Sequence, residues 1–356
     1  MKGLILSGGK GTRLRPLTFT QAKQLVPVAN KPVLFYGIEA LIGAGIRDIG
    51  IIVGDTKAEI QEAVGDGRKW GPDVRISYIE QPEPLGLAHA VLVAEGFLDA
   101  QPFVMYLGDN ILKSGIVSLV EEFERRRPNA LILLTPVPNP QMFGVAELQD
   151  GRVVRLVEKP KEPKSNLALV GVYMFDPHIF EAARAIKPSW RNELEITDAI
   201  QYLVDHGYAV EPHLVSGWWK DTGKIEDILE ANRLILETIR GSVDGDGDEA
   251  TRVSGEVIIE KGVTVRSSTI RGPAIIGAGT EISDSYVGPF TSIQRNCRIV
   301  KTEIEHSIVL EGSEIVDVGS RIDESLIGRE VRIYKCPPKP VAYRFMVGDK
   351  SEIGLK

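Results

Sequence analysis

The chain has 356 residues, 43% of them hydrophobic, and this length predicts two domains rather than a single core. Its 42 lysines and arginines against 49 aspartates and glutamates give a net charge of −7, which argues against nucleic acid or an anionic membrane as a partner. No stretch approaches the ~18 consecutive apolar residues of a membrane span, and no signal-peptide pattern opens the chain. Cys297 and Cys336 form no CxxC pair, so we expect a reducing, cytoplasmic compartment and no zinc site.

The first predicted element is a short apolar strand, residues 4–6, that runs into a glycine-rich turn. Gly8, Gly9 and Gly11 allow the backbone N–H groups to approach a ligand closely. Arg13 and Lys23 follow and add positive charge to the same rim. The turn matches neither a Walker A loop nor the complete dinucleotide fingerprint, whose third glycine is absent. The sequence therefore predicts a site for a polyanion, most simply a triphosphate.

Strands and helices then alternate as far as residue 240. Strands are expected at 49–53, 75–79, 103–107, 130–135, 144–148, 153–158, 168–175 and 209–214, and helices at 31–44, 86–97, 116–126, 196–205 and 224–237. Such alternation is typical of an α/β fold, a Rossmann-like and mostly parallel sheet covered on both faces. Ligands of these sheets bind at the carboxyl ends of strands, where the glycine-rich turn and Asp109 both fall.

The remainder of the chain has a different pattern. Residues 241–252 are rich in glycine and aspartate and are expected to form a linker between residues 1–240 and a second domain at 253–356. In that second domain aliphatic residues recur every 17 positions, in three columns: Ile259, Ile276, Ile293, Leu310 and Ile327; Val265, Ile282, Ile299, Val316 and Ile333; and Ile270, Val287 and Ile304. Three inward positions per coil predict a triangular parallel β-helix, with a β-sandwich as the alternative.

The run G-G-x-G-T-R-L-R-P-L-T followed by K-Q-L-V-P-V resembles the signature of the sugar-1-phosphate nucleotidylyltransferases, and the resemblance extends from Met1 to about Arg240. Members that transfer a thymidylyl group and carry a C-terminal left-handed β-helix are the most similar. The resemblance implies transfer of a nucleotidyl group from dTTP to glucose 1-phosphate, giving dTDP-glucose and pyrophosphate for deoxysugar and antibiotic biosynthesis. It also implies a Mg²⁺ ion and a homo-oligomer, either a trimer or a tetramer.

This reaction joins two anions, so charge neutralisation and alignment are its main requirements. The resemblance assigns Arg13 and Lys23 to the leaving pyrophosphate and Lys159 to the attacking sugar phosphate. It assigns the metal to Asp109 and Asp221, whose oxygens suit Mg²⁺.

Two binding sets complete the expectation. The nucleotide set is Leu6, Ser7, Gly8, Gly9, Gly11, Thr12, Arg13, Gln24, Gln81, Gly86 and Leu107. The sugar-phosphate set is Asn110, Gly144, Glu158, Lys159, Val170, Tyr173 and Arg191. Within them, the Gln81 amide can pair with the edge of a pyrimidine, and Glu158 can accept hydrogen bonds from sugar hydroxyls.

Two residues depart from the family pattern, since Leu85 stands where aspartate is frequent and His89 where glutamine is common. Both adjoin the base-binding turn, so a UTP-using or relaxed enzyme is the alternative. A non-catalytic sensor should lack one of the charged residues, and all of them are present. An acyltransferase built around His306 is a further alternative, although the repeat shows no loop insertion that would shape its donor site.

Overall fold

The computed structural model describes residues 1–9, 11–336, 347 and 353–354. Lys10 and most of the residues after Cys336, which the sequence assigns to the second domain, lie outside the described residues. The chain forms two compact units. The first consists of Met1–Lys10, Gln21–Leu25 and Val33–Asp221, and the second of Gly11–Thr20, Val26–Pro32 and Thr222–Lys356. Among the described residues, no helix combines the length and the apolar character needed to cross a membrane.

The first unit is built on a nine-stranded sheet in the order β10-β9-β11-β6-β1-β4-β5, with β8 next to β11 and β12 next to β8. The strands are β1 Lys2–Leu6, β4 Asp48–Val53, β5 Arg75–Glu80, β6 Phe103–Leu107, β8 Ala130–Pro136, β9 Gly144–Gln149, β10 Arg152–Glu158, β11 Leu167–Phe175 and β12 Val210–Leu214. β1 runs parallel to β4 and β6, and β4 parallel to β5, whereas β11 is antiparallel to β6 and β8. The predicted α/β sheet is thus confirmed.

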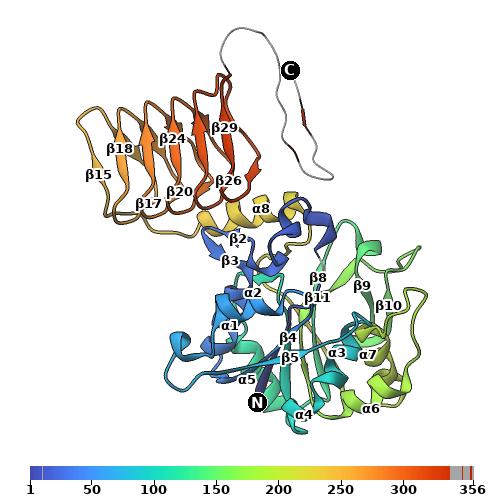
Figure 1. Cartoon of the computed structure of the whole chain (residues 1–356). Coiled ribbons are helices and arrows are strands. Elements are labelled where there is room, and N and C mark those ends of the chain that lie inside the picture. The colour runs from blue at the N-terminus through green and yellow to red at the C-terminus, as the bar shows by residue number, and fades with distance from the viewer. Residues whose placement is uncertain (10, 337–346, 348–352, 355–356) are drawn as a thin grey trace. The chain divides into compact units, whose positions relative to one another are not determined.

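Helices cover both faces of this sheet (Figure 1). They are α1 Val33–Gly43, α2 Lys57–Val64, α3 Leu87–Val93, α4 Glu95–Leu98, α5 Val117–Arg126, α6 His178–Ala185 and α7 Ile196–Asp205. Successive side chains of a strand point to opposite faces. Leu4 and Leu6 of β1 therefore enter the core under α3, α6 and α7, and Ile5 enters the core under α1, α2 and α5.

Several element limits differ from the expected ones. The expected helix 31–44 begins only at Val33, because Lys31–Pro32 forms β3, which pairs with β2, Pro27–Val28. The expected helix 86–97 begins after Gly86, whose φ of 104° is incompatible with a helix, and it divides at Ala94 into α3 and α4. A short antiparallel ladder of β7, Asn110–Leu112, and β13, Trp219–Asp221, was not expected.

The second unit contains the predicted parallel β-helix, which is confirmed. Its short strands stack in three parallel sheets, ordered β14-β17-β20-β23-β26-β28, β15-β18-β21-β24-β27-β29 and β16-β19-β22-β25 (Figure 1). The strands are β14 Ser242–Val243, β15 Asp246–Gly247, β16 Arg252–Ser254, β17 Val257–Ile259, β18 Thr264–Arg266, β19 Thr269–Arg271, β20 Ala274–Ile276, β21 Glu281–Ser283, β22 Tyr286–Val287, β23 Thr291–Ile293, β24 Arg298–Val300, β25 Glu303–Ile304, β26 Ile308–Val309, β27 Glu314–Val316, β28 Leu326–Ile327 and β29 Arg332–Tyr334. Aliphatic side chains from all three sheets fill the interior.

The segment expected as a linker, 241–252, differs from that expectation because it forms the first coil. β14 pairs with β17 and β15 with β18, both in parallel. Backbone pairing needs no large side chain, and here a large one would not fit. A Cβ on Gly245 would lie 2.7 Å from Ile259 Cγ2. At position 245, a glycine that suggests flexibility is therefore required by close packing.

Two of the predicted column positions, Leu310 and Val316, are wrong by one residue. The ladder pairs Val309 with both Ile293 and Ile327, and it pairs Ile315 with both Ile299 and Ile333. The corner after Ile304 is one residue shorter than in earlier coils, and the segment from Ile315 to Ile322 is two residues longer. This insertion, unseen in the sequence, borders a groove of about 610 Å³ beside Tyr286 and Lys301.

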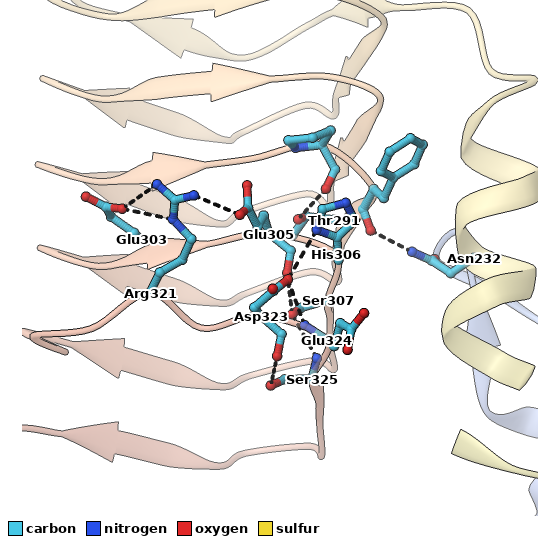
Figure 2. Close-up of polar contacts among 12 residues, drawn as sticks. Asn232, Thr291, Glu303, Glu305, His306, Ser307, Arg321, Asp323, Glu324 and Ser325 are labelled. Atoms are coloured by element: carbon cyan, nitrogen blue, oxygen red, sulfur yellow. Dashed lines mark hydrogen bonds and ion pairs between the residues drawn. The ribbon is translucent and has the colours of Figure 1, made fainter. Parts of the chain in front are cut away.

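Polar contacts join the irregular coil to its neighbours (Figure 2). Arg321 donates to Glu303 at 2.9 Å and to Glu305 at 2.8 Å, and His306 Nδ1 lies 3.1 Å from Asp323 Oδ1. The His306 ring also stacks on Phe290, with 5.3 Å between centroids. Glu305, His306 and Asp323 offer possible metal-ligand atoms within 4.8 Å of one another. Arg321 already neutralises Glu305, and His306 and Asp323 pair with each other, so a structural network accounts for the cluster.

Helix α8, Ile225–Leu236, connects parts of the second unit through the fully buried Asn232. Asn232 Nδ2 donates to Phe290 O at 3.0 Å (Figure 2). Its Oδ1 accepts from Ala29 N at 2.8 Å and from Ser292 Oγ at 2.7 Å. One side chain thus links α8, the β2–β3 turn and the β-helix.

Candidate active site

A cavity of about 240 Å³ lies where β1, β4, β5 and β6 end. It brings together the predicted nucleotide-binding residues Leu6, Gly8, Gly9, Gln24, Gln81, Gly86 and Leu107, together with Lys23 and Asp109. We call it the first cavity. Residues from four strand ends converge because carboxyl ends of parallel strands share one edge of the sheet.

Two glycines of the turn keep this cavity open. A Cβ on Gly9 would lie 3.3 Å from Lys23 Cε, and one on Gly8 would lie 3.5 Å from Gln81 Oε1. Ser7 does not line the cavity; it is fully buried, and its backbone N donates to Ile52 O at 2.9 Å. The lining of the first cavity thus combines glycines with charged, amide and apolar side chains.

Lys23 and Asp109 form an ion pair at the first cavity, and each side chain is only 14% exposed. Burial alone would raise the pKa of Asp109, but the Lys23 charge and hydrogen bonds from Lys23 and Asn110 outweigh it and hold that pKa below its ordinary value. Asn110 Nδ2 donates to Asp109 Oδ1 at 2.8 Å. Asp109 is therefore ionised at neutral pH and already faces a cation.

A second cavity of about 220 Å³ is lined by the predicted sugar-phosphate residues Asn110, Gly144, Glu158, Lys159, Tyr173 and Arg191, and by Asp221. Both cavities are lined by Leu87, Leu107 and Glu193, so they are adjacent. Asp109 lines the first cavity and Asp221 the second. Two ligands can therefore lie in neighbouring cavities, each with one aspartate in its lining.

Acidic and basic groups alternate in the second cavity. Glu158 Oε1 lies 3.7 Å from Lys159 Nζ and 3.4 Å from Arg191, while Glu158 Oε2 accepts from Thr197 Oγ1 at 2.7 Å. Arg191 also contacts Glu193 at 2.9 Å and Glu195 at 3.4 Å. Burial raises the pKa of the Glu195 carboxyl, and the nearby Glu158 charge raises it further. The site thus offers two cations for a phosphate and a carboxylate for hydroxyl groups.

Backbone conformation and packing restrict two positions here. Lys159 has a φ of 42°, a left-handed conformation that is uncommon for a non-glycine residue and is concentrated at functional sites. A Cβ on Gly144 would lie 2.8 Å from Thr197 Oγ1 and 3.1 Å from Glu158 Oε2. Gly144 therefore leaves room for the Thr197–Glu158 hydrogen bond.

The carboxylates suit a divalent cation. Asp221 lies opposite Asn110 in the β13–β7 ladder, so Asp109 and Asp221 are one position apart across two paired strands. Trp219 Nε1 donates to Asn110 Oδ1 at 2.5 Å and so orients the side-chain amide of Asn110, the residue after Asp109 and opposite Asp221. Asp109 and Asp221 line adjacent cavities, and carboxylate oxygens are donors that hard divalent ions accept.

Other predicted site residues lie elsewhere. Val170 is fully buried in the core beside Ile5, because alternation along β11 brings Leu169 and Gly171, and not Val170, to the cavity. Gly11, Thr12 and Arg13 belong to the second unit. There, Gly11 has a φ of 60° and its O accepts from Thr18 Oγ1 at 2.7 Å.

Sequence reasoning missed several residues of the second cavity. Phe143 and Trp219 pack edge to face, with 5.5 Å between ring centroids, and Thr197 orients Glu158. Glu193 borders both cavities. The position of Trp219 two residues before Asp221 was an available signal. A lone threonine at the start of a helix gave none.

Comparison with known proteins agrees with this geometry. A family model described as nucleotidyl transferase matches residues 2–238. A glucose-1-phosphate thymidylyltransferase of Streptomyces antibioticus is 58% identical over 358 residues, covering 100% of both chains. The low-salt glycan biosynthesis nucleotidyltransferase Agl11 of Haloferax volcanii is 50% identical over 362 residues, again covering 100% of both. A solved Bacillus anthracis structure, described as a glucose-1-phosphate thymidylyltransferase with sucrose bound, has 37% identity and a TM-score of 0.63, covering 68% of this chain and 98% of its own.

Proposed function

The chain belongs to the nucleotidyl transferase family, and we propose that it transfers the thymidylyl group of dTTP to glucose 1-phosphate, giving dTDP-glucose and pyrophosphate. The observation that carries this proposal is the pair of adjacent cavities, one lined by the residues expected to bind a nucleotide and the other by those expected to bind a sugar phosphate. The thymidylyltransferase relative from Streptomyces spans the whole chain and supports the choice of substrates and a link to antibiotic biosynthesis.

In the proposed reaction the first cavity holds dTTP and the second holds glucose 1-phosphate. Gln81 and Gly86 contact the base, and Lys23 neutralises the phosphates. Lys159 and Arg191 bind the sugar phosphate and orient its oxygen toward the α-phosphorus, while Glu158 accepts from sugar hydroxyls. Holding two anions in line supplies most of what this chemistry needs. Arg13 is proposed to contact the leaving pyrophosphate.

Members of this family generally use a divalent metal, and we propose Mg²⁺ held by Asp109 and Asp221. When bound, the ion would supply positive charge at the α-phosphate. Lys23 would then share Asp109 with the ion and move toward the phosphates. A homo-oligomer, trimer or tetramer, and a cytoplasmic location complete the proposal.

The direct test is pyrophosphate release from dTTP and glucose 1-phosphate in the presence of Mg²⁺. Asp109→Asn should lower kcat at least a hundredfold while leaving the circular dichroism spectrum unchanged, because the charge is lost and the shape is kept. Asp150→Asn, an exposed residue in the turn between β9 and β10, is the matched control and should keep wild-type activity. Absence of turnover with every nucleotide and sugar phosphate tried would reject the proposal.

A further inference from the structure

The two ends of the Gln81 side-chain amide have different neighbours. Gln81 directly follows β5 and lines the first cavity. Its Nε2 donates to Gly86 O at 3.2 Å and lies 2.9 Å from His89 Nδ1. His89 is on α3 and does not line the cavity. Its contact with Gln81 therefore links it to the first cavity.

These contacts determine which way the amide points. A carbonyl oxygen can only accept, so Gly86 O requires the NH₂ end of Gln81 on its side. The second amide hydrogen then faces His89 Nδ1, which accepts it. Both hydrogens are satisfied inside the protein. The oxygen end lies on the side of Gly8, 3.5 Å from where a Gly8 Cβ would be, and Gly8 also lines the first cavity.

We propose that His89 is a positioning residue for base selection, an inference that rests on the proposed function. By accepting the second amide hydrogen it keeps the oxygen of Gln81 toward the nucleotide. An acceptor there pairs with the N3–H of thymine or uracil and is repelled by cytosine, whose N3 is itself an acceptor. The selected class is thus the pyrimidine nucleotides that carry an N3 proton.

His89 is needed because Gly86 O satisfies only one of the two amide hydrogens. Without an acceptor at position 89, an amide that turns away from these contacts gives up one hydrogen bond instead of two, so other orientations become more populated. With a cation at position 89, the amide oxygen turns toward that cation and the NH₂ group turns toward the base. One hydrogen bond to a neutral partner corresponds to about tenfold in an equilibrium constant, so selectivity should change by about that factor.

Three variants separate these cases: His89→Gln can still accept, His89→Leu cannot, and His89→Lys only donates. We would measure kcat and KM for dTTP and dCTP with glucose 1-phosphate. The ratio of kcat/KM for dTTP over dCTP should stay within about twofold in His89→Gln, fall about tenfold in His89→Leu, and fall further in His89→Lys. The changes should lie mainly in the nucleotide KM. Glu83→Gln, exposed in the neighbouring loop, is the control and should keep the wild-type ratio.

A double-mutant cycle tests whether His89 acts through Gln81. In a Gln81→Leu background, His89→Leu should leave the dTTP to dCTP ratio unchanged, whereas two independent effects would multiply. A wild-type ratio in His89→Leu, an equal loss in His89→Gln and His89→Leu, or multiplying effects would each overturn the inference. Those results require an active wild-type enzyme. An inactive wild-type enzyme with intact folding would instead refute the proposed function.

Discussion

Just after β6, the Asp109 carboxylate forms a largely buried ion pair with the Lys23 ammonium, and removing one partner should lower the stability of the fold. Lys23→Met leaves the Asp109 carboxylate buried without its cation, since each side chain is only 14% exposed. We expect roughly 3 kcal/mol of lost stability at pH 7, together with at least a hundredfold loss of kcat. Urea unfolding and pyrophosphate release measure the two effects.

The pH dependence of that loss has a definite sign. In the wild type the pKa of Asp109 is depressed, so its contribution to stability is present above the unfolded pKa of about 3.9 and is lost as pH falls through the lower folded value. In Lys23→Met the pKa of Asp109 should be raised by burial, so the deficit should be largest at neutral pH and shrink toward pH 4. Lys57→Met removes an exposed ion pair with Glu80 and should cost under about 1 kcal/mol at either pH. A deficit independent of pH would contradict the assignment.

Gly144 tests the second cavity on its own. Gly144→Ala places a methyl group 2.8 Å from Thr197 Oγ1 and 3.1 Å from Glu158 Oε2, so the hydrogen bond between them must break. We expect the KM for glucose 1-phosphate to rise about tenfold with little change in the KM for dTTP, because about one hydrogen bond is lost. Steady-state kinetics with each substrate varied in turn would check this.

Gly43→Ala is the matched control for Gly144→Ala. Gly43 is the last residue of α1, and a Cβ there meets no atom within 4 Å. The control should therefore be neutral or slightly stabilising. An equal rise in both KM values in Gly144→Ala would indicate general damage rather than a local effect on Glu158.

At the scale of elements, α8 depends on one amide. Asn232 is fully buried and makes three hydrogen bonds, to Ala29, Phe290 and Ser292. Asn232→Leu leaves those three groups without this partner and should cost about 3 kcal/mol, since each buried unsatisfied group costs about 1–3 kcal/mol. Thermal unfolding followed by circular dichroism measures this loss. Glu226→Gln, exposed on the same helix, should stay within about 0.5 kcal/mol of the wild type, and an equal loss in both variants would disprove the link.

The β-helix shows what periodicity can and cannot predict at this scale. A repeat of 17 residues predicted the coils, because each inward position must be aliphatic wherever the ladder continues. It could not locate the shortened corner that brings Val309 inward in place of Leu310. Both residues are aliphatic and both are buried, so composition alone does not distinguish them.

At the scale of the whole molecule, two compact units with separate hydrophobic cores predict unfolding in more than one step. The lining residues of both cavities lie in the first unit, whereas Gly11, Thr12 and Arg13 lie in the second. A ligand stabilises the folded unit that binds it, by about 2.7 kcal/mol when the ligand concentration is a hundred times the Kd. In calorimetry, dTTP and glucose 1-phosphate should therefore each shift the transition of the first unit. A first transition that ignores both ligands would contradict binding at these cavities.

The α/β sheet and the β-helix could be predicted from the sequence, and so could the proposal that Lys23, Asp109, Glu158, Lys159, Arg191 and Asp221, which line the two cavities, act in the site. Strand alternation, a 17-residue repeat and glycines beside cations are local patterns, and local patterns are imposed by backbone geometry and burial. Three features required the folded structure: Val170 faces the core, Thr197 and Trp219 orient Glu158 and Asn110, and residues 241–252 form a coil. Those outcomes depend on which surfaces pack together across long sequence separations, and such contacts cannot be predicted from a short stretch of the chain.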